Sequence, residues 1–126
     1  MEEPVIGLGI DAVEIDRFRR VLARTPGVAR RLFTEGERAY GARYKDPAPR
    51  LAARFAAKEA TMKALGVGLG AFAFHDVEVV RAPSGAPSLA VSGAAADRAA
   101  ALGVTGFRLS ITHTDRTAEA VVAALS

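Results

Sequence analysis

Residues 51–70 read LAARFAAKEATMKALGVGLG, the most regular stretch of the chain. Its alanine-rich part predicts a helix over residues 51–65, because alanine has the highest helix propensity, and Gly66 suits the end of that helix. At about 100° per residue, the apolar side chains fall on one stripe, formed by Leu51, Phe55, Met62 and Leu65. Charged residues lie in or beside this stripe, namely Arg54, Lys58, Glu59 and Lys63. Glu59 and Lys63 are four residues apart and suit an ordinary ion pair on a helix surface. Four charged residues in or beside an apolar stripe also indicate a functional site, because buried charges need partners.

The segment VIGLGID, residues 5–11, alternates between two kinds of side chain, which predicts a β-strand. One face carries Ile6, Leu8 and Ile10, and the other carries Gly7, Gly9 and Asp11. Glycine lets another backbone or a ligand approach that second face closely. Asp11 suits either an ordinary strand end or a metal site shared with Glu59. One aspartate and one glutamate without histidine suit Mg²⁺, which keeps several waters and binds substrate phosphates.

The rest of the pattern predicts a single α+β domain over residues 1–126. Helices are expected over about residues 16–25, with Asp16 as N-cap, and 34–44, where Thr34 and Glu37 form a capping box. Residues 45–50 are expected to form a loop. A further helix at 93–102 and strands at 76–82, 88–92, 107–112 and 117–125 complete the prediction. The expected order is β-α-α-α-β-β-α-β-β, with a mostly antiparallel sheet.

Composition excludes several classes of site. The chain has no cysteine, which excludes disulfides, thiolate zinc sites and a cysteine nucleophile. His75 and His113 are its two histidines, too few for a multi-histidine metal centre. No apolar run approaches the roughly 20 residues that span a bilayer, and the acidic start is unlike a signal peptide, so we expect a cytoplasmic protein without a membrane partner. A chain of 126 residues has little room for a deep cleft formed within one subunit, so a large substrate should bind at a surface or between subunits.

Positive charge is concentrated in one short segment. Residues 17–31 hold six arginines and no acidic residue, although the net charge of the whole chain is only +3. Arg17, Arg20 and Arg24 fall on one side of the expected helix, opposite Phe18 and Leu22. A solvated face, nucleic acid, anionic lipid and an acidic protein all fit this charge pattern.

Three segments resemble bacterial holo-acyl-carrier-protein synthases, the small phosphopantetheinyl transferases. They are GLGIDAVEIDRF (residues 7–18), the run at 51–70 and LSITHT (residues 109–114). The resemblance implies the 4′-phosphopantetheinyl transferase fold and a homotrimer with active sites between subunits. It also implies transfer of the 4′-phosphopantetheine arm of coenzyme A to a serine of apo-acyl carrier protein, which releases adenosine 3′,5′-bisphosphate.

The same resemblance implies a role for each matching residue. Asp11 and Glu59 match magnesium ligands, and Lys63 matches a lysine near the phosphates. Glu59 and Lys63 are the expected catalytic residues, with Glu59 as base, directly or through a metal-bound water. The expected coenzyme A contacts are Arg54, Lys58, Lys63 and His113, within one subunit or across an interface. The expected docking surface for the acidic carrier protein is formed by Arg17, Arg20 and Arg24.

Two other functions compete with this interpretation. A nucleic-acid-binding module could use the basic helix, but the chain lacks tryptophan and has no basic motif interleaved with aromatic residues that stack on bases. We therefore expect no nucleic-acid partner. A non-catalytic trimeric scaffold could have the same fold, but Asp11, Glu59 and Lys63 together argue for an enzyme.

Overall fold

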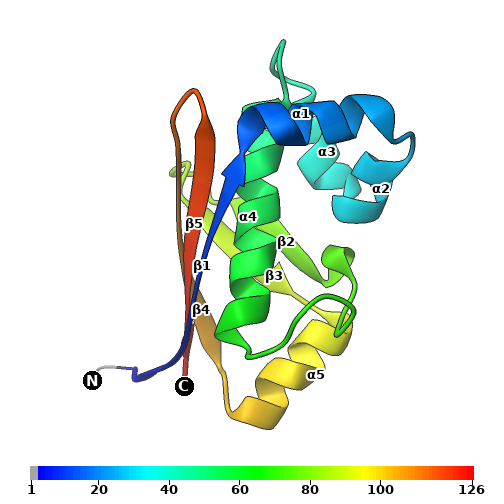
Figure 1. Cartoon of the computed structure of the whole chain (residues 1–126). Helices are drawn as coiled ribbons and strands as arrows, with labels where there is room; N and C mark the ends of the chain where they lie inside the picture. The colour runs from blue at the N-terminus through cyan, green and yellow to red at the C-terminus, as the bar shows by residue number, and fades with distance from the viewer. Residues whose placement is uncertain (1–2) are drawn as a thin grey trace.

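The computed structural model describes residues 3–126, built around one central helix (Figure 1). This helix is α4 (Ala48–Ala64), and it packs against a sheet with the order β1-β5-β4. A second sheet pairs β2 with β3. The strands are β1 (Val5–Glu14), β2 (Val77–Arg81), β3 (Pro87–Val91), β4 (Gly106–His113) and β5 (Thr117–Leu125). The other helices are α1 (Ile15–Arg24), α2 (Val28–Leu32), α3 (Glu35–Gly41), the 3₁₀ turn Phe74–Asp76 and α5 (Gly93–Leu102).

Both sheets are antiparallel, which confirms the α+β class and the antiparallel pairing predicted from the sequence. The first sheet joins the two ends of the chain, because β1 at the N-terminus pairs with β5 at the C-terminus. Helices α1, α2 and α3 gather at one end of α4, and α5 lies near the other end (Figure 1). Among residues 3–126, no helix is long and apolar enough to cross a membrane.

The glycine face of β1 lies directly against the backbone of α4. A Cβ atom built on Gly9 would lie 1.8 Å from the carbonyl oxygen of Ala60, and one on Gly7 would lie 2.0 Å from that of Ala64. No side chain fits there, so the close backbone approach predicted from the alternating pattern is confirmed. Asp11 is on the same face of β1 as Gly7 and Gly9. The close approach of strand and helix therefore brings Asp11 next to α4.

Replacing Gly9 with alanine should therefore lower the free energy of unfolding by about 1–3 kcal/mol or more, because the new methyl group must push α4 away from the sheet. The free energy of unfolding, measured by urea denaturation, checks this. Gly68→Ala is the matched control, because a Cβ there meets no atom within 4 Å. Equal stability of the two variants would contradict the packing described here.

The opposite face of β1 is apolar and exposed. The exposed fractions of Ile6, Leu8 and Ile10 are 47%, 66% and 62%, and Val121 on neighbouring β5 is 39% exposed. Large apolar side chains gathered on one strand face of a small protein mark an interaction surface. We call these four residues the outer apolar face.

The beginnings of two helices differ from the sequence-based prediction. Helix α1 begins at Ile15, and Glu14 occupies the N-cap position without a side-chain hydrogen bond. Asp16 was expected to cap this helix, but it lies in the first turn and pairs with Arg19. Helix α4 begins at Ala48, so the loop expected over 45–50 is partly helical. Prolines suit this first turn because they lack a donor that would remain unpaired there.

The order of elements contains a helix that the pattern did not predict. Helix α2 has only five residues, too few for a periodic pattern, and it begins after Gly27 in the left-handed conformation (φ 83°). The capping box at Thr34 and Glu37 is confirmed, since Thr34 Oγ accepts from the Glu37 amide and Glu37 Oε1 accepts from the Thr34 amide. Helix α3 then ends at Gly41, three residues before the predicted end.

Candidate functional site

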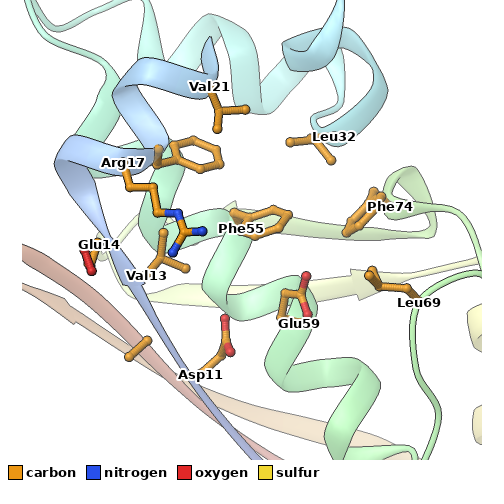
Figure 2. Close-up of a pocket in the computed structure, with 12 residues that line it drawn as sticks. Asp11, Val13, Glu14, Arg17, Val21, Leu32, Phe55, Glu59, Leu69 and Phe74 are labelled. Carbon is orange, nitrogen blue, oxygen red and sulfur yellow. The ribbon is translucent and has the colours of Figure 1, made fainter. Parts of the chain in front are cut away.

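A cleft of about 610 Å³ opens between β1, α1, α4 and the segment that follows α4. Figure 2 shows the carboxylates of Asp11 and Glu59 extending into the same end of the cleft. Two further charged residues, Glu14 and Arg17, line the side next to α1. The remaining side chains are mostly aromatic or aliphatic, namely Val13, Phe18, Val21, Leu32, Phe55, Leu69 and Phe74. The cleft therefore has an acidic end and an apolar end.

Three of the predicted site residues come together at the acidic end. Asp11 projects from the glycine face of β1, and Glu59 projects from α4, which packs on that face. Lys63 lies one helical turn after Glu59, and its ammonium donates to Asp11 Oδ1 at 3.1 Å and to the carbonyl of Ile10 at 2.9 Å. The Lys63 side chain is 54% exposed, so its ammonium stays accessible to a ligand.

Burial raises the pKa of Glu59 above its ordinary value, and the negative charge of Asp11 raises that pKa further. The ammonium of Lys63 acts in the opposite direction, without cancelling the two effects. The ionised form of Glu59 is therefore less favourable than in a free side chain, and a further positive charge nearby would favour it. A cation bound between the two carboxylates would supply that charge.

The two carboxylates at the acidic end suit Mg²⁺ better than a metal ion whose ligands all come from the protein. Within residues 3–126, no group of three or more histidine, cysteine, aspartate or glutamate side chains could hold a metal. Two carboxylates are nevertheless sufficient for Mg²⁺, which commonly binds one or two of them together with waters and substrate phosphates. Asp11 and Glu59 are the residues that could hold it.

The apolar end of the cleft is built from stacked aromatic rings. Phe55 lies between Phe18 and Phe74, with ring centroids 5.3 Å and 5.7 Å away. Phe55 is on α4 one turn before Glu59, and Phe74 begins the 3₁₀ turn. The middle ring of the aromatic wall and the Glu59 carboxylate therefore share one helix, while Leu69, 70% exposed, extends the apolar wall toward solvent.

A second, basic hollow of about 380 Å³ lies elsewhere on the chain. Its polar side chains are Tyr40, Tyr44, Arg50, Arg54, Arg81, Thr112 and His113. The Arg54 guanidinium lies 3.9 Å from the centroid of the Tyr40 ring, and Arg50 lies 3.8 Å from that of Tyr44. Arg54 is only 3% exposed, burial lowers its pKa, and its Nε has no hydrogen-bond partner within the described part of the chain. Among residues 3–126, no acidic side chain lines this hollow, which favours an anionic ligand.

The structure thus divides the predicted coenzyme A contacts between two places. Lys63 lies beside the cleft, whereas Arg54 and His113 line the basic hollow, and the two cavities share no lining residue among those that the structure describes. One chain does not bring all of these residues to a single ligand site.

The predicted contact between Lys58 and coenzyme A does not fit the structure and is corrected here. Lys58 is completely buried, and its ammonium donates to Glu37 Oε1 at 2.8 Å, to the Phe74 carbonyl at 2.9 Å and to the Val77 carbonyl. All three of its protons are used inside the protein. The position of Lys58 within the apolar stripe already indicated burial.

Several residues of the basic hollow were missed by the sequence analysis. Tyr40 and Tyr44 are four residues apart, as are Arg50 and Arg54, so each pair shares a helical face or its extension. The spacing of Arg50 and Arg54 did not indicate a shared helical face, because the sequence predicts a loop over residues 45–50. With α4 extended to Ala48, Arg50 and Arg54 lie on the same side of one helix.

The arginines of α1 do not all behave alike. Arg17, Arg20 and Arg24 are exposed, as their spacing predicts, but Arg17 also lines the cleft, and Figure 2 shows its guanidinium reaching toward Phe55 and Val13. Arg19 instead pairs with Asp16 and with Asp46, whose Oδ2 lies 2.6 Å away. Of the three exposed arginines, Arg17 thus borders the cleft, and Arg20 and Arg24 lie outside its lining.

Comparison with known proteins gives a consistent result. Residues 7–123 match the 4′-phosphopantetheinyl transferase superfamily. The chain is 49% identical to the holo-[acyl-carrier-protein] synthase of Frankia casuarinae over 120 residues, covering 95% of this chain and 97% of the relative. It is 50% identical to that of Streptomyces avermitilis over 120 residues, with the same coverage.

Solved structures of similar proteins have the same fold. The holo-(acyl-carrier-protein) synthase of Bacillus anthracis, in complex with CoA (3′,5′-ADP), is 33% identical, with a TM-score of 0.82 and 99% of each chain covered. The Helicobacter pylori synthase in complex with coenzyme A is 30% identical, with a TM-score of 0.79, covering 94% of this chain and 99% of the other.

Proposed function

The chain belongs to the 4′-phosphopantetheinyl transferase superfamily, among the holo-[acyl-carrier-protein] synthases, and we propose that it transfers the 4′-phosphopantetheine arm of coenzyme A to a serine of apo-acyl carrier protein. The observation that carries this proposal is the convergence of Asp11, Glu59 and Lys63 at one end of a cleft bordered by a basic helix. Phosphoryl transfer needs charge neutralisation and positioning more than covalent chemistry, and these residues suit both tasks.

Asp11 and Glu59 would hold Mg²⁺, which when bound neutralises negative charge on the pyrophosphate of coenzyme A. The raised pKa of Glu59 supports this assignment, because burial and the charge of Asp11 disfavour its ionised form and a bound cation would favour it. The magnesium requirement is part of the proposal.

The residues of the chain have distinct tasks in the transfer. The serine oxygen of the carrier protein forms a bond to the phosphorus that bears the pantetheine arm, and the bond from that phosphorus to the bridging oxygen breaks. Adenosine 3′,5′-bisphosphate leaves with the bridging oxygen. The half-exposed Lys63 ammonium can bind a phosphate oxygen, where it stabilises the developing charge. A carboxylate oxygen of Glu59 is the candidate acceptor for the serine proton.

The basic hollow supports a site shared between subunits. Coenzyme A carries phosphates at two separate places, and Arg54 and His113 lie in a cavity separate from the cleft. We assign the pyrophosphate to the acidic end of one subunit and the remaining phosphate to the basic hollow of a neighbour. The outer apolar face is the kind of surface that would bury itself in the proposed homotrimer.

The activity is tested by incubating the protein with coenzyme A, Mg²⁺ and an apo-acyl carrier protein, and then measuring the intact mass of the carrier protein. We expect a gain of one phosphopantetheine arm, lost when excess chelator is present and restored by added Mg²⁺. An unchanged carrier mass would contradict the proposed activity, and full transfer in excess chelator would contradict the magnesium assignment alone.

Carrier-protein docking is assigned to the exposed arginines of α1. Reversing Arg20 and Arg24 to glutamate should raise the KM for the carrier protein, because several exposed charges together steer an acidic partner even though each pair contributes only ~0.2–1 kcal/mol. The KM for coenzyme A serves as the internal control, because neither side chain lines the cleft or the basic hollow. Steady-state kinetics with each substrate varied separately checks this. Equal changes in both KM values would contradict docking on this surface.

A further inference from the structure

A buried ionic network ties α3, α4 and the start of β2 together. The Glu37 carboxylate is 1% exposed and accepts from the Thr34 amide through Oε1 and from the Val79 amide through Oε2, each at 2.9 Å. The Lys58 ammonium contacts the same Oε1 at 2.8 Å. One ion pair thus links the beginning of α3, the middle of α4 and strand β2.

The remaining two bonds of Lys58 reach the segment that forms the aromatic wall. Its ammonium donates to the Phe74 carbonyl oxygen at 2.9 Å. It also donates to the carbonyl oxygen of Val77, on the other side of the 3₁₀ turn. The ring of Phe74 stacks on Phe55 and lines the cleft that also contains Glu59. The backbone of this wall is therefore fastened to α4 from inside the protein.

Between α4 and Phe74 the chain is anchored by two apolar side chains, Val67 and Phe72, which pack in the core. The segment from residue 66 to residue 73 is irregular, and Gly66, Gly68, Leu69 and Gly70 within it are exposed. At the 3₁₀ turn, His75 bonds the Arg30 carbonyl at the surface, and the two bonds from Lys58 hold the buried side of the turn where it meets the cleft. Without them, the Phe74 carbonyl would keep only the Val77 amide as donor and the Val77 carbonyl would lose the ammonium, and buried acceptors that lose a donor move toward water.

We propose that Lys58, held by Glu37, is a positioning residue that fixes the Phe74 wall of the cleft and thereby the binding of the donor substrate. The proposal rests on the proposed function for the identity of that substrate, coenzyme A, whose pantetheine arm would run from the acidic end along this wall. Lys58 does not touch the substrate. Its effect is transmitted through the backbone of residues 74–77.

The absence of cysteine from the sequence permits a test that changes only the ammonium group. In Lys58→Cys, the single thiol is alkylated in denaturant and the protein is refolded. Treatment with bromoethylamine gives a side chain with the length and charge of lysine, and treatment with iodopropane gives a neutral side chain of the same length. The sequence also lacks tryptophan, so Phe74→Trp in the same background provides a single fluorescent reporter at the wall.

We expect the aminoethyl form to match the refolded Phe74→Trp parent in KM for coenzyme A and in the emission maximum of the tryptophan reporter. The propyl form should raise that KM by about tenfold and shift the emission to longer wavelength, with a much smaller change in kcat, because a displaced wall weakens binding rather than chemistry. A propyl form with parental KM and emission would overturn the proposal, even if its melting temperature fell. Equal changes in both alkylated forms would overturn it too.

Two controls separate positioning from a general loss of stability. Val104→Ala opens a core cavity away from the cleft and should lower the melting temperature without changing the KM for coenzyme A or the emission of the reporter. If the propyl form does not refold, Glu37→Gln replaces it, and unchanged KM and emission in that variant would overturn the proposal. If the wild-type protein transfers no phosphopantetheine, the proposed function fails, while the emission of the reporter still tests the positioning.

Discussion

Glu59→Gln should lower kcat by about two to four orders of magnitude, because the substitution removes both a candidate base and half of the carboxylate pair. Glutamine has nearly the same size, and Glu59 is only partly buried, so the fold should remain intact. The rate at which the mass of apo-acyl carrier protein increases, at saturating coenzyme A, measures the loss.

The matched control is Glu35→Gln, which removes the same charge from an exposed position in the first turn of α3. It should retain the wild-type rate. If Glu59→Gln keeps a rate close to that of the control, the acidic end of the cleft is not where the chemistry occurs.

Lys58→Met should lower the free energy of unfolding by about 3–5 kcal/mol, because it leaves the buried Glu37 carboxylate without its counter-charge. This is a large part of the stability of a domain of this size, which is typically about 5–15 kcal/mol. Urea denaturation followed by circular dichroism measures the change.

Lys63→Met is the control for stability, since it makes the same substitution five residues later on the same helix. The ion pair of Lys63 with Asp11 is half-exposed, and such pairs contribute only ~0–1 kcal/mol. A loss of stability at Lys58 no larger than at Lys63 would show that the buried pair does not support the core.

The position of the acidic end of the cleft could be predicted from local sequence patterns. The alternation in β1 placed Asp11 on the same face as Gly7 and Gly9, and glycine on a strand face indicated that another backbone would pack there. Helix α4 is the element that does so, and Glu59 and Lys63 are one turn apart on it. The strand and the helix each had a strong periodic signal, so their meeting point could be anticipated.

Lys58 shows where the same reasoning failed. The sequence placed it inside an apolar stripe, and the resemblance suggested a substrate contact. Its partners come from α3, the 3₁₀ turn and β2, which no local pattern connects to α4. The choice between a ligand and an internal carboxylate depends on tertiary contacts that spacing along one helix does not contain.

The separation of Arg54 and His113 from the cleft has a similar origin. His113 ends β4 and Arg54 lies on α4 over the ring of Tyr40 of α3, and their shared hollow forms where these three elements come together. Short helices such as α2 escape periodic analysis altogether, because five residues make little more than one turn.

We propose that one active site combines Glu59 of one subunit with His113 of another. Subunits of Glu59→Gln and His113→Ala are prepared separately, mixed in denaturant and refolded together, and the mass gain of the carrier protein is measured. Each variant alone should transfer slowly, while the mixture should recover a substantial part of the wild-type rate, because some interfaces then contain both intact residues. A mixture no faster than the sum of the two separate variants would contradict the shared site.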